Sequence, residues 1–259
     1  MAIAVLYVKF FTLSLRNFSL KCLKGRAVLN DRITNIAGVV LAGGKCRRMG
    51  GVDKAFISID GQPIIHRTLE ILSEIFDEVI LVSNSPEKYY AYKNDIVIVS
   101  DLIPDVGPLA GIYTAMSSTE KDAVFVTACD MPFLDKAFIE KELTCFDALS
   151  PEILFPRTGD HIEPLCALYS TKIMGRMASY IQSSSDHSIR SFAATVDTQY
   201  LELKDSHTRR KMFSNVNCQD DVRRTRGSKE AVDTREKGIG QLKISNIDAR
   251  PIRGDSAAL

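Results

Sequence analysis

The sequence predicts an α/β protein built on one doubly wound, mostly parallel sheet, and three observations support this fold class. Short apolar runs rich in β-branched residues recur along the chain, beginning with residues 36–41, and such runs are typical of buried strands. Segments with apolar residues at helical spacing lie between them, as in residues 64–75. Polar residues directly follow several runs, for example Asp130. Strands that alternate with helices at this spacing favour a parallel sheet with helices on both faces.

The predicted elements follow one another without an internal repeat. Asp60 and Gly61 predict a tight turn after a short extended piece, and Pro63 suits the start of a helix because its φ is fixed and it lacks an N–H. The predicted strands are residues 36–41, 78–83, 96–99, 123–128, 153–155 and 164–169, with a last or edge strand at 198–203. The predicted helices are residues 63–75, 86–93, 109–117, 135–143, 172–182 and 188–195.

Residues 35–224 are expected to form this single domain, and the segments on either side differ from it in composition. Residues 1–34 are basic, with no acidic residue between Met1 and Arg26, and we expect an unstructured extension there, with a targeting segment as the alternative. Residues 225–259 are polar and charge-mixed, which predicts a mobile tail or the stub of a fused second domain.

Composition limits the expected partners and compartment. The formal net charge of +1 gives no overall field that would attract nucleic acid or an anionic membrane, so we expect neither as a partner. Six cysteines and four histidines occur without metal-ligand spacing, which argues against a zinc site or a disulfide framework and suits a reducing cytoplasm.

A glycine-rich and basic loop follows the first predicted strand, with the sequence LAGGKCRRMGGVDK over residues 41–54. A loop at the end of a buried strand is a usual phosphate site of α/β proteins, and Gly43 and Gly44 let the backbone approach an anion closely. The loop lacks the GxxxxGK[ST] pattern of a P-loop and the GxGxxG pattern of a dinucleotide site. It therefore predicts a triphosphate site of another kind, with positive charge from Lys45, Arg47, Arg48 and Lys54.

Three further polar residues come at the ends of predicted strands: Asn84, Asp101 and Asp130. Ligands of an open parallel sheet bind at the carboxyl ends of its strands, so these residues are expected beside the loop. Two carboxylates near a triphosphate suit Mg²⁺, which takes hard oxygen ligands. A helix cap or turn is the alternative for Asp101, whereas Asp130, fixed by the following Met131 and Pro132, is predicted to face a ligand.

These motifs resemble the MobA family of molybdenum cofactor guanylyltransferases over residues 36–221. The resemblance is carried by LAGGKCRRMGGVDK, GPLAGI at 107–112, CDMPF at 129–133, EPLCALY at 163–169 and FSNVN at 213–217. It implies a Rossmann-like, nucleotidyltransferase-type sheet. It also implies the binding residues for a guanine nucleotide and its metal: Leu41, Ala42 and Gly43 through their backbone, Lys54 at a phosphate, Asp101 at guanine or the nucleoside, and Asp130 at Mg²⁺.

The resemblance implies transfer of GMP from GTP to the phosphate of molybdopterin in the molybdenum cofactor, with release of pyrophosphate. The attacking phosphate is already anionic, so no strong general base is required. Arg48 and Lys54 would offset the charge that gathers on pyrophosphate, and Asp130 would hold Mg²⁺, so these three are the expected catalytic residues. GTP and the molybdenum cofactor are the expected substrates, with transient contacts to cofactor-synthesis or acceptor proteins.

The sequence leaves alternatives open for some residues and for the substrate. The guanine-side Asn of the family falls on Val82 when positions are counted without gaps, and Asn84 is a candidate close to it. Asn215 and Asn217 fit a second metal contact, the pterin side or a helix cap. The alternative functions are a cytidylyltransferase or sugar-phosphate nucleotidyltransferase of the same superfamily, or an inactive nucleotide-binding module.

Overall fold

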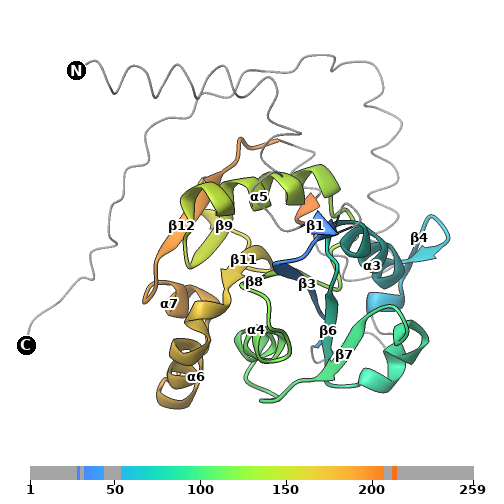
Figure 1. Ribbon diagram of the computed structural model, residues 1–259, viewed down its shortest axis with the longest axis horizontal. Helices are drawn as coiled ribbons and strands as arrows, with labels where there is room; N and C mark the ends of the chain where they lie inside the picture. The colour runs from blue at the N-terminus through green and yellow to red at the C-terminus, as the bar shows by residue number, and fades with distance from the viewer. Residues whose placement is uncertain (1–27, 30–31, 44–53, 207–211, 215–259) are drawn as a thin grey trace, which may run out of the picture.

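The computed structural model describes residues 28–29, 32–43, 54–206 and 212–214, and these confirm an α/β fold with one eight-stranded sheet (Figure 1). The strand order is β10-β9-β11-β8-β3-β6-β7, and β12 pairs with β9. The strands are β3 (Ile36–Leu41), β6 (Val79–Ser83), β7 (Val97–Ser100), β8 (Ala123–Ala128), β9 (Ile153–Thr158), β10 (His161–Ile162), β11 (Cys166–Ser170) and β12 (Thr198–Glu202). Each predicted strand is therefore present, with small shifts at its ends.

The sheet is parallel in one half and mixed in the other. β3 pairs in parallel with β6 and β8, and β6 with β7, and helical segments connect these strands, as parallel pairing requires. β11 pairs antiparallel with both β8 and β9, because the chain turns back near Gly159 without a crossover helix. β12 rejoins β9 in parallel. The predicted mostly parallel sheet thus carries an antiparallel insertion.

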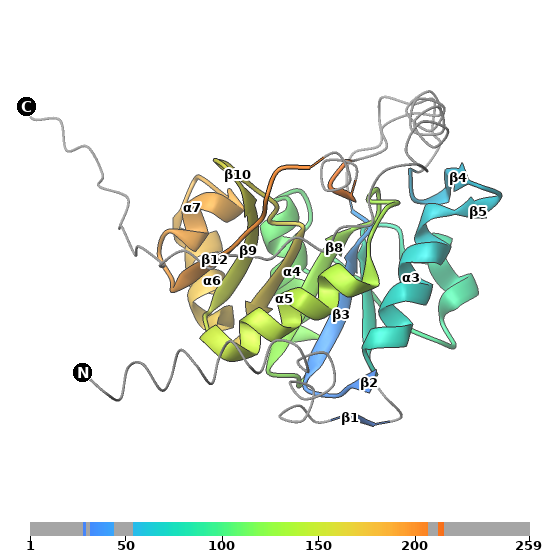
Figure 2. The same ribbon diagram turned by 90° about the horizontal axis from the view of Figure 1, so that it is seen from above.

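Helices cover both faces of the sheet, as Figure 2 shows from above. One face carries α3 (Ile64–Ile75) and α5 (Lys136–Leu149), and the other carries α4 (Pro108–Ser117), α6 (Met174–Ser183) and α7 (Ile189–Ala193). Successive strand side chains point to opposite faces, so Ile36 and Val40 of β3 lie in the first core and Ala37 and Val39 in the second. The doubly wound arrangement predicted from the sequence is confirmed.

Several helical boundaries differ from the prediction. The described residues form three short 3₁₀ helices, η2 (Lys54–Phe56), η3 (Pro86–Tyr92) and η4 (Thr171–Ile173), and the last of these precedes α6. α5 begins where the Asp135 side chain accepts a hydrogen bond from Ala137 N at 2.9 Å, a normal helix cap. It runs on to Leu149 and ends at Ser150, which has a φ of 49°. The turn at Asp60 and Gly61 joins β4 (Ser58–Ile59) to β5 (Gln62–Pro63), as predicted.

A two-stranded hairpin, β1 (Val28–Leu29) and β2 (Arg32–Ile33), precedes β3. The side chain of Ile33 is 3 % exposed, and its backbone forms a parallel bridge with Phe76. Within residues 1–34, which were expected to be an unstructured extension, residues 28–29 and 32–33 thus form strands. Residues 1–27 and the predicted tail at 225–259 lie outside the described residues. Within the described part, no helix is long and apolar enough to cross a membrane.

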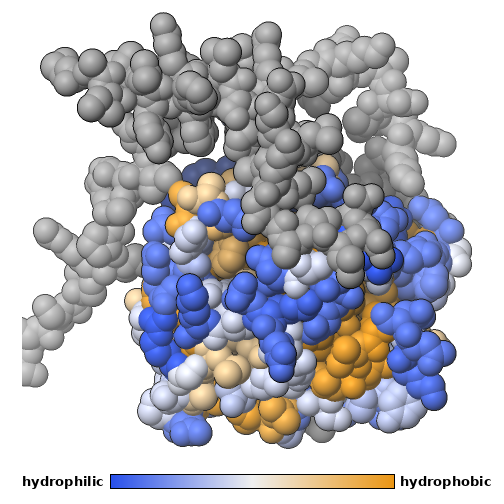
Figure 3. Space-filling model, in the orientation of Figure 1, coloured by the Kyte–Doolittle hydropathy of each residue, from blue (hydrophilic) through white to orange (hydrophobic). Residues whose placement is uncertain are grey.

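The two edges of the sheet are formed by β7 and β12. β7 forms one edge, where Val97 is 43 % and the following Leu102 61 % exposed. Figure 3 shows hydrophobic surface in the region of β6 and β7. At the other end of the sheet, β12 pairs in parallel with β9 along its whole length.

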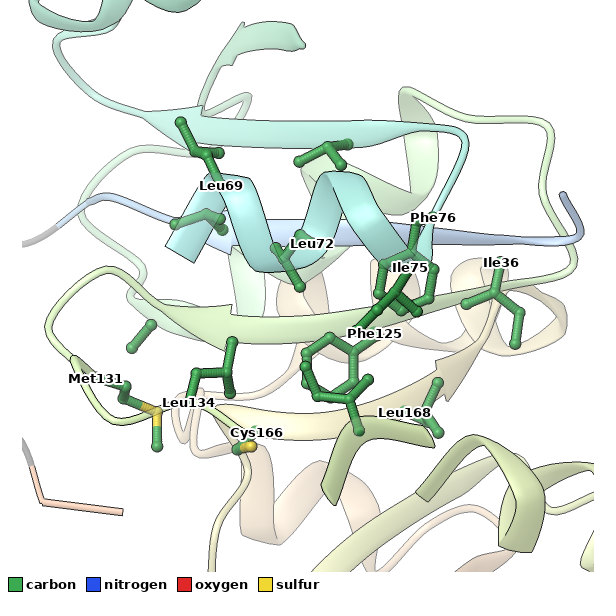
Figure 4. Packing of buried hydrophobic residues seen from close by; sticks show 14 of the residues in the cluster. Ile36, Leu69, Leu72, Ile75, Phe76, Phe125, Met131, Leu134, Cys166 and Leu168 are labelled. Carbon is green, nitrogen blue, oxygen red and sulfur yellow. The ribbon is translucent and has the colours of Figure 1, made fainter. Parts of the chain in front are cut away.

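The core between α3, α5 and the sheet packs around two aromatic rings (Figure 4). Phe76 stacks on Phe125 with ring centroids 5.9 Å apart. A Cβ placed on Gly38 would lie 2.7 Å from Cδ2 of Phe76, which is closer than non-bonded carbon atoms approach. Glycine at position 38 therefore lets the end of α3 lie directly on the central strand.

Glu142 is a buried carboxyl in α5, a helix that otherwise turns apolar residues toward the sheet. It is 0 % exposed, and neither of its carboxyl oxygens has a hydrogen-bond partner among the described residues. Removal from water raises the pKa of Glu142 well above its ordinary value, and the nearby Lys141 lowers that pKa only in part. A buried oxygen without a partner costs free energy, so this side chain weakens the fold locally.

We predict that Glu142→Met raises the free energy of unfolding at pH 7 by about 1–3 kcal/mol, because methionine removes the unpaired oxygens at similar length. The raised pKa lets the folded protein keep its proton above pH 4.5 while the unfolded chain releases it. Wild-type stability is then lost as pH rises from 4.5 toward the folded pKa, and the variant lacks this loss. Denaturant unfolding across pH measures both effects; a variant less stable than the wild type at pH 7 would contradict the prediction.

Candidate active site

A cavity of about 610 Å³ lies at the carboxyl ends of β3, β6, β7 and β8. This is the edge at which an open parallel sheet binds ligands. The lining residues come from the strand ends and the segments that follow them: Leu41, Ala42, Gly43, Lys54, Val82, Ser83, Asn84, Ser85, Lys88, Asp101, Asp105, Gly107, Pro108, Gly111, Ala128, Cys129, Asp130 and Leu165. The described residues that the sequence predicted to bind a ligand therefore meet in one place.

A second hollow of about 710 Å³ lies near the amino ends of the strands, lined by Thr34, Glu78 and residues 117–121. Its lysine, Lys121, is already used within the fold, since Nζ donates to Thr34 O at 2.7 Å and to Asp77 Oδ2 at 2.9 Å. We therefore place the active site in the smaller cavity, where strand ends and polar groups converge.

The backbone of residues 41–43 is fastened to both neighbouring strands. Ala42 N donates to Val82 O at 2.8 Å, and Cys129 N donates to Leu41 O at 3.1 Å. Gly43 then enters the exposed part of the cavity, where an added Cβ would lie 3.8 Å from Asn84 Nδ2. Residues 44–53 follow and lie outside the described residues, so the expected role of Arg48 stays a prediction.

Lys54 and Asp130 form the charged end of the cavity. Lys54 begins η2, Asp130 follows β8, and Lys54 Nζ lies 3.7 Å from Asp130 Oδ2. Their side chains are 26 % and 17 % exposed. Burial raises the pKa of Asp130, and the positive charge of Lys54 lowers that pKa in part. A partly buried carboxylate beside a lysine is a suitable place for a cation and a phosphate to be held together.

Asp101 lies at the end of β7 and lines the cavity. Its Oδ1 accepts hydrogen bonds from Ile103 N at 3.2 Å and from Thr114 Oγ1 at 3.1 Å. The bond to Ile103 N is the turn interaction that the sequence offered as the alternative to a ligand role. Asp101 therefore closes a turn and also lines the cavity, and its contact with a nucleotide stays a prediction.

The amide at the β6 end of the cavity belongs to Asn84. Val82 is 2 % exposed, and its side chain is part of the core under α4. Ser83 fixes the next turn, because its Oγ donates to Ala42 O at 3.2 Å and accepts from Ser85 N at 3.1 Å. Counting without gaps therefore falls on a side chain that packs in the core, and Asn84, which lines the cavity, stays the candidate for this role.

Two charged residues of the cavity were missed in the sequence, namely Lys88 in η3 and Asp105 in the loop before α4. Asp105 has a φ of 67° and Gly107 a φ of 103°, so this loop is tightly turned where it enters α4. Its only sequence signal is the glycine two residues after the aspartate. Lys88 has none, because a lysine in a short helix is usually solvated.

His161 and Glu163 are not among the residues that line the cavity. His161 is exposed, and its Nε2 lies 3.5 Å from Glu163 Oε1. Burial raises the pKa of Glu163, and His161 and Arg190 lower it. Asn215 and Asn217 lie outside the described residues. The described part of the chain holds no cluster of three His, Cys, Asp or Glu residues that could bind a metal by itself.

The fold and this cavity define an α/β enzyme of the nucleotidyltransferase class. The chain belongs to the MobA-like NTP transferase family, whose domain matches residues 38–201. A molybdenum cofactor guanylyltransferase of Syntrophotalea carbinolica is 35 % identical over 193 residues, covering 73 % of this chain and 90 % of the relative. Another from Desulfosudis oleivorans is 33 % identical over 141 residues, covering 54 % and 67 %.

The fold agrees with a solved structure of this group. The molybdopterin-guanine dinucleotide biosynthesis protein A of Archaeoglobus fulgidus has a TM-score of 0.61 and 23 % identity. The similarity covers 74 % of this chain and 97 % of that protein. The resemblance found in the sequence motifs is thus confirmed at the level of the family and the fold.

We predict that Lys54→Ala weakens nucleotide binding and slows turnover together. A charged hydrogen bond of about 1.5–3 kcal/mol is lost, which corresponds to a roughly 10- to 100-fold effect. Steady-state kinetics with nucleotide titration measure it. Lys136→Ala is the matched control, because Lys136 pairs with Glu74 on the exposed side of the molecule at 2.8 Å and should leave the kinetics unchanged. An unchanged Lys54→Ala enzyme would show that this lysine does not contact the nucleotide.

Proposed function

We propose that this protein transfers GMP from GTP to the phosphate of molybdopterin in the molybdenum cofactor, releasing pyrophosphate and forming the guanine dinucleotide cofactor. The observation that carries the proposal is the cavity that joins the backbone of residues 41–43 with Lys54, Asp101 and Asp130. Relatives of the chain are named for this reaction. The cavity volume of about 610 Å³ lies in the range of small-molecule sites.

The distribution of polar groups supports one orientation of the nucleotide. Lys54 and Asp130 lie 3.7 Å apart at one end and suit the triphosphate. Asn84 and Asp101 follow β6 and β7 and offer hydrogen-bonding groups to the nucleoside. Leu41 ends β3, between β6 and β8 in the sheet, and Ala42 and Gly43 directly follow it. The backbone of these three residues would contact the nucleotide along its length.

Catalysis in this proposal rests on positioning and on charge neutralisation. The attacking phosphate of the cofactor is an anion, so the site needs no strong base, and the protein has only to align the two phosphates. Lys54, together with Arg48 of the neighbouring loop, would offset negative charge on the departing pyrophosphate. Both residues bring their charge from segments that directly follow the nucleotide-binding strand.

Magnesium fits the phosphate end of the cavity. Asp130 offers a hard carboxylate oxygen there. Burial raises the pKa of this carboxyl because it disfavours the charged form, and a bound cation would offset that effect. Mg²⁺ is usually held by one or two carboxylates together with phosphate oxygens and water, so a single protein carboxylate is sufficient. Bound at Asp130, the ion would supply positive charge to the nucleotide phosphates.

The expected substrates and surroundings belong to the same proposal. GTP and the molybdenum cofactor would be the substrates, with transient contacts to the proteins that deliver or receive the cofactor. A cytoplasmic location agrees with the buried thiol of Cys166, which forms no disulfide in the described part of the chain, because thiols persist in a reducing compartment.

We predict that Asp130→Ala lowers kcat on the order of 10²- to 10³-fold, the usual size of a lost electrostatic contact at a reacting centre, while the fold survives. Asp135→Ala is the control. Asp135 lies five positions further on and caps α5, so its loss should reduce stability by about 1 kcal/mol and leave the kcat of the folded enzyme intact. Wild-type turnover in Asp130→Ala would exclude Asp130 as the metal ligand.

The substrate assignment is tested by release of pyrophosphate with GTP or CTP in the presence of the molybdenum cofactor. We expect activity with GTP and less than about one hundredth of it with CTP, because a site that hydrogen-bonds one base leaves polar groups unpaired with another. Activity with CTP alone would make the protein a cytidylyltransferase. Binding of GTP without any product from either nucleotide would support the inactive nucleotide-binding module.

A further inference from the structure

Thr114 is a buried hydroxyl residue of α4 that lies behind the cavity. It is 0 % exposed. Its Oγ1 donates to Asp101 Oδ1 at 3.1 Å and accepts from Leu102 N at 3.0 Å. A hydroxyl can donate and accept at the same time, whereas an apolar side chain of the same shape can do neither. Thr114 therefore connects the helix to the two residues that directly follow β7, Asp101 and Leu102.

These bonds fix the carboxylate of Asp101 through one oxygen only. Oδ1 accepts hydrogen bonds from both Thr114 Oγ1 and Ile103 N. Among the described residues, Oδ2 accepts no hydrogen bond. The terminal torsion of an aspartate is broad, so an unsupported carboxylate would sample many orientations. Two donors on one oxygen restrict that rotation and leave the second oxygen as the acceptor for a ligand.

The position of Thr114 is itself tied to the nucleotide-binding strand. Gly111, one helical turn earlier, packs so closely on β3 that an added Cβ would lie 3.2 Å from a methyl group of Leu41. Residues three apart share a helix face, so the face of α4 that rests on Leu41 also supports Asp101. The position of the Asp101 carboxylate is thus fixed relative to the backbone that we expect to contact the nucleotide.

We propose that Thr114 is a positioning residue for nucleoside recognition, which fixes Asp101 as an acceptor for N–H or O–H groups of the nucleoside. The proposal rests on the proposed function in that the ligand is a guanine nucleotide. Fixing an acceptor before the ligand arrives reduces the ordering that binding has to supply. The interaction is the same in the ground state and during transfer, so it affects KM rather than kcat.

The test is a series of variants at one position. Thr114→Ser keeps the hydroxyl, Thr114→Cys replaces it with a weaker group, and Thr114→Val removes it at the same shape. We expect the KM for GTP to stay near the wild-type value in Ser, to rise in Cys, and to rise roughly tenfold in Val, with kcat changed less than about threefold. A Val variant with unchanged KM would overturn the proposal. If Val does not fold, equal KM values for Ser and Cys would overturn it.

A purely structural role is separated from positioning by a matched control and a double variant. Thr68 is 1 % exposed in α3, and its Oγ1 donates to Ile64 O at 3.0 Å. Thr68→Val should therefore lose stability without a change in KM. In an Asp101→Asn background, Thr114→Val should raise KM no further, because the two changes act on one contact. An additional rise there would mean that Thr114 acts through the Leu102 loop instead.

Direct binding distinguishes failure of this proposal from failure of the proposed function. Calorimetric titration with GTP, ITP and 2′-deoxy-GTP measures nucleotide binding without the molybdenum cofactor. We expect Thr114→Val to weaken GTP binding by the factor seen in KM. The effect should vanish with ITP when Asp101 accepts from the base amino group, or with 2′-deoxy-GTP when it accepts from the ribose. A wild-type enzyme that binds GTP but forms no dinucleotide would remove the proposed function and still test Thr114.

Discussion

Backbone hydrogen bonds continue past the end of β3 on both sides, from Ala42 N to Val82 O and from Cys129 N to Leu41 O. They extend the parallel ladders of β3 with β6 and β8 by one further residue. Three strands therefore end at the same level, and the residues that follow them are delivered to one edge. Because both faces of β3 are buried, a slip in register would exchange its two cores, so this level cannot change without unfolding the sheet.

Buried hydroxyls turn this level edge into a defined geometry. Ser83 joins the carbonyl of Ala42 to the turn that carries Asn84, and Thr114 joins α4 to the end of β7. Each hydroxyl is almost completely removed from water, where hydrogen bonds hold their partners more firmly. The charged pair of Lys54 and Asp130 remains closer to solvent, which suits groups that exchange ligands.

Strong periodicity made the strands and helices predictable, and the rule that ligands bind at carboxyl ends placed Asp101 and Asp130 correctly. The direction of β11 was not predictable, because a fully buried apolar run reads the same in a parallel or antiparallel strand. The choice between Val82 and Asn84 depends on which side chain is buried, and counting positions in the sequence gives no information on burial. Lys88 and Asp105 reach the cavity because tertiary packing folds their connections back over the sheet. The roles of Arg48, Asn215 and Asn217 remain predictions.

The antiparallel insertion has a consequence for how such a protein can change over evolution. β11 begins beside the cavity, where Ala128 N donates to Leu165 O at 3.2 Å and Leu165 lines the wall. The preceding turn near Gly159 joins two strands at the surface, and surface turns tolerate insertions. One side of the pocket can therefore diversify through short hairpin changes, while the nucleotide side stays constrained by two buried ladders. Selectivity for the second substrate can therefore change during evolution while the binding of the nucleotide is retained.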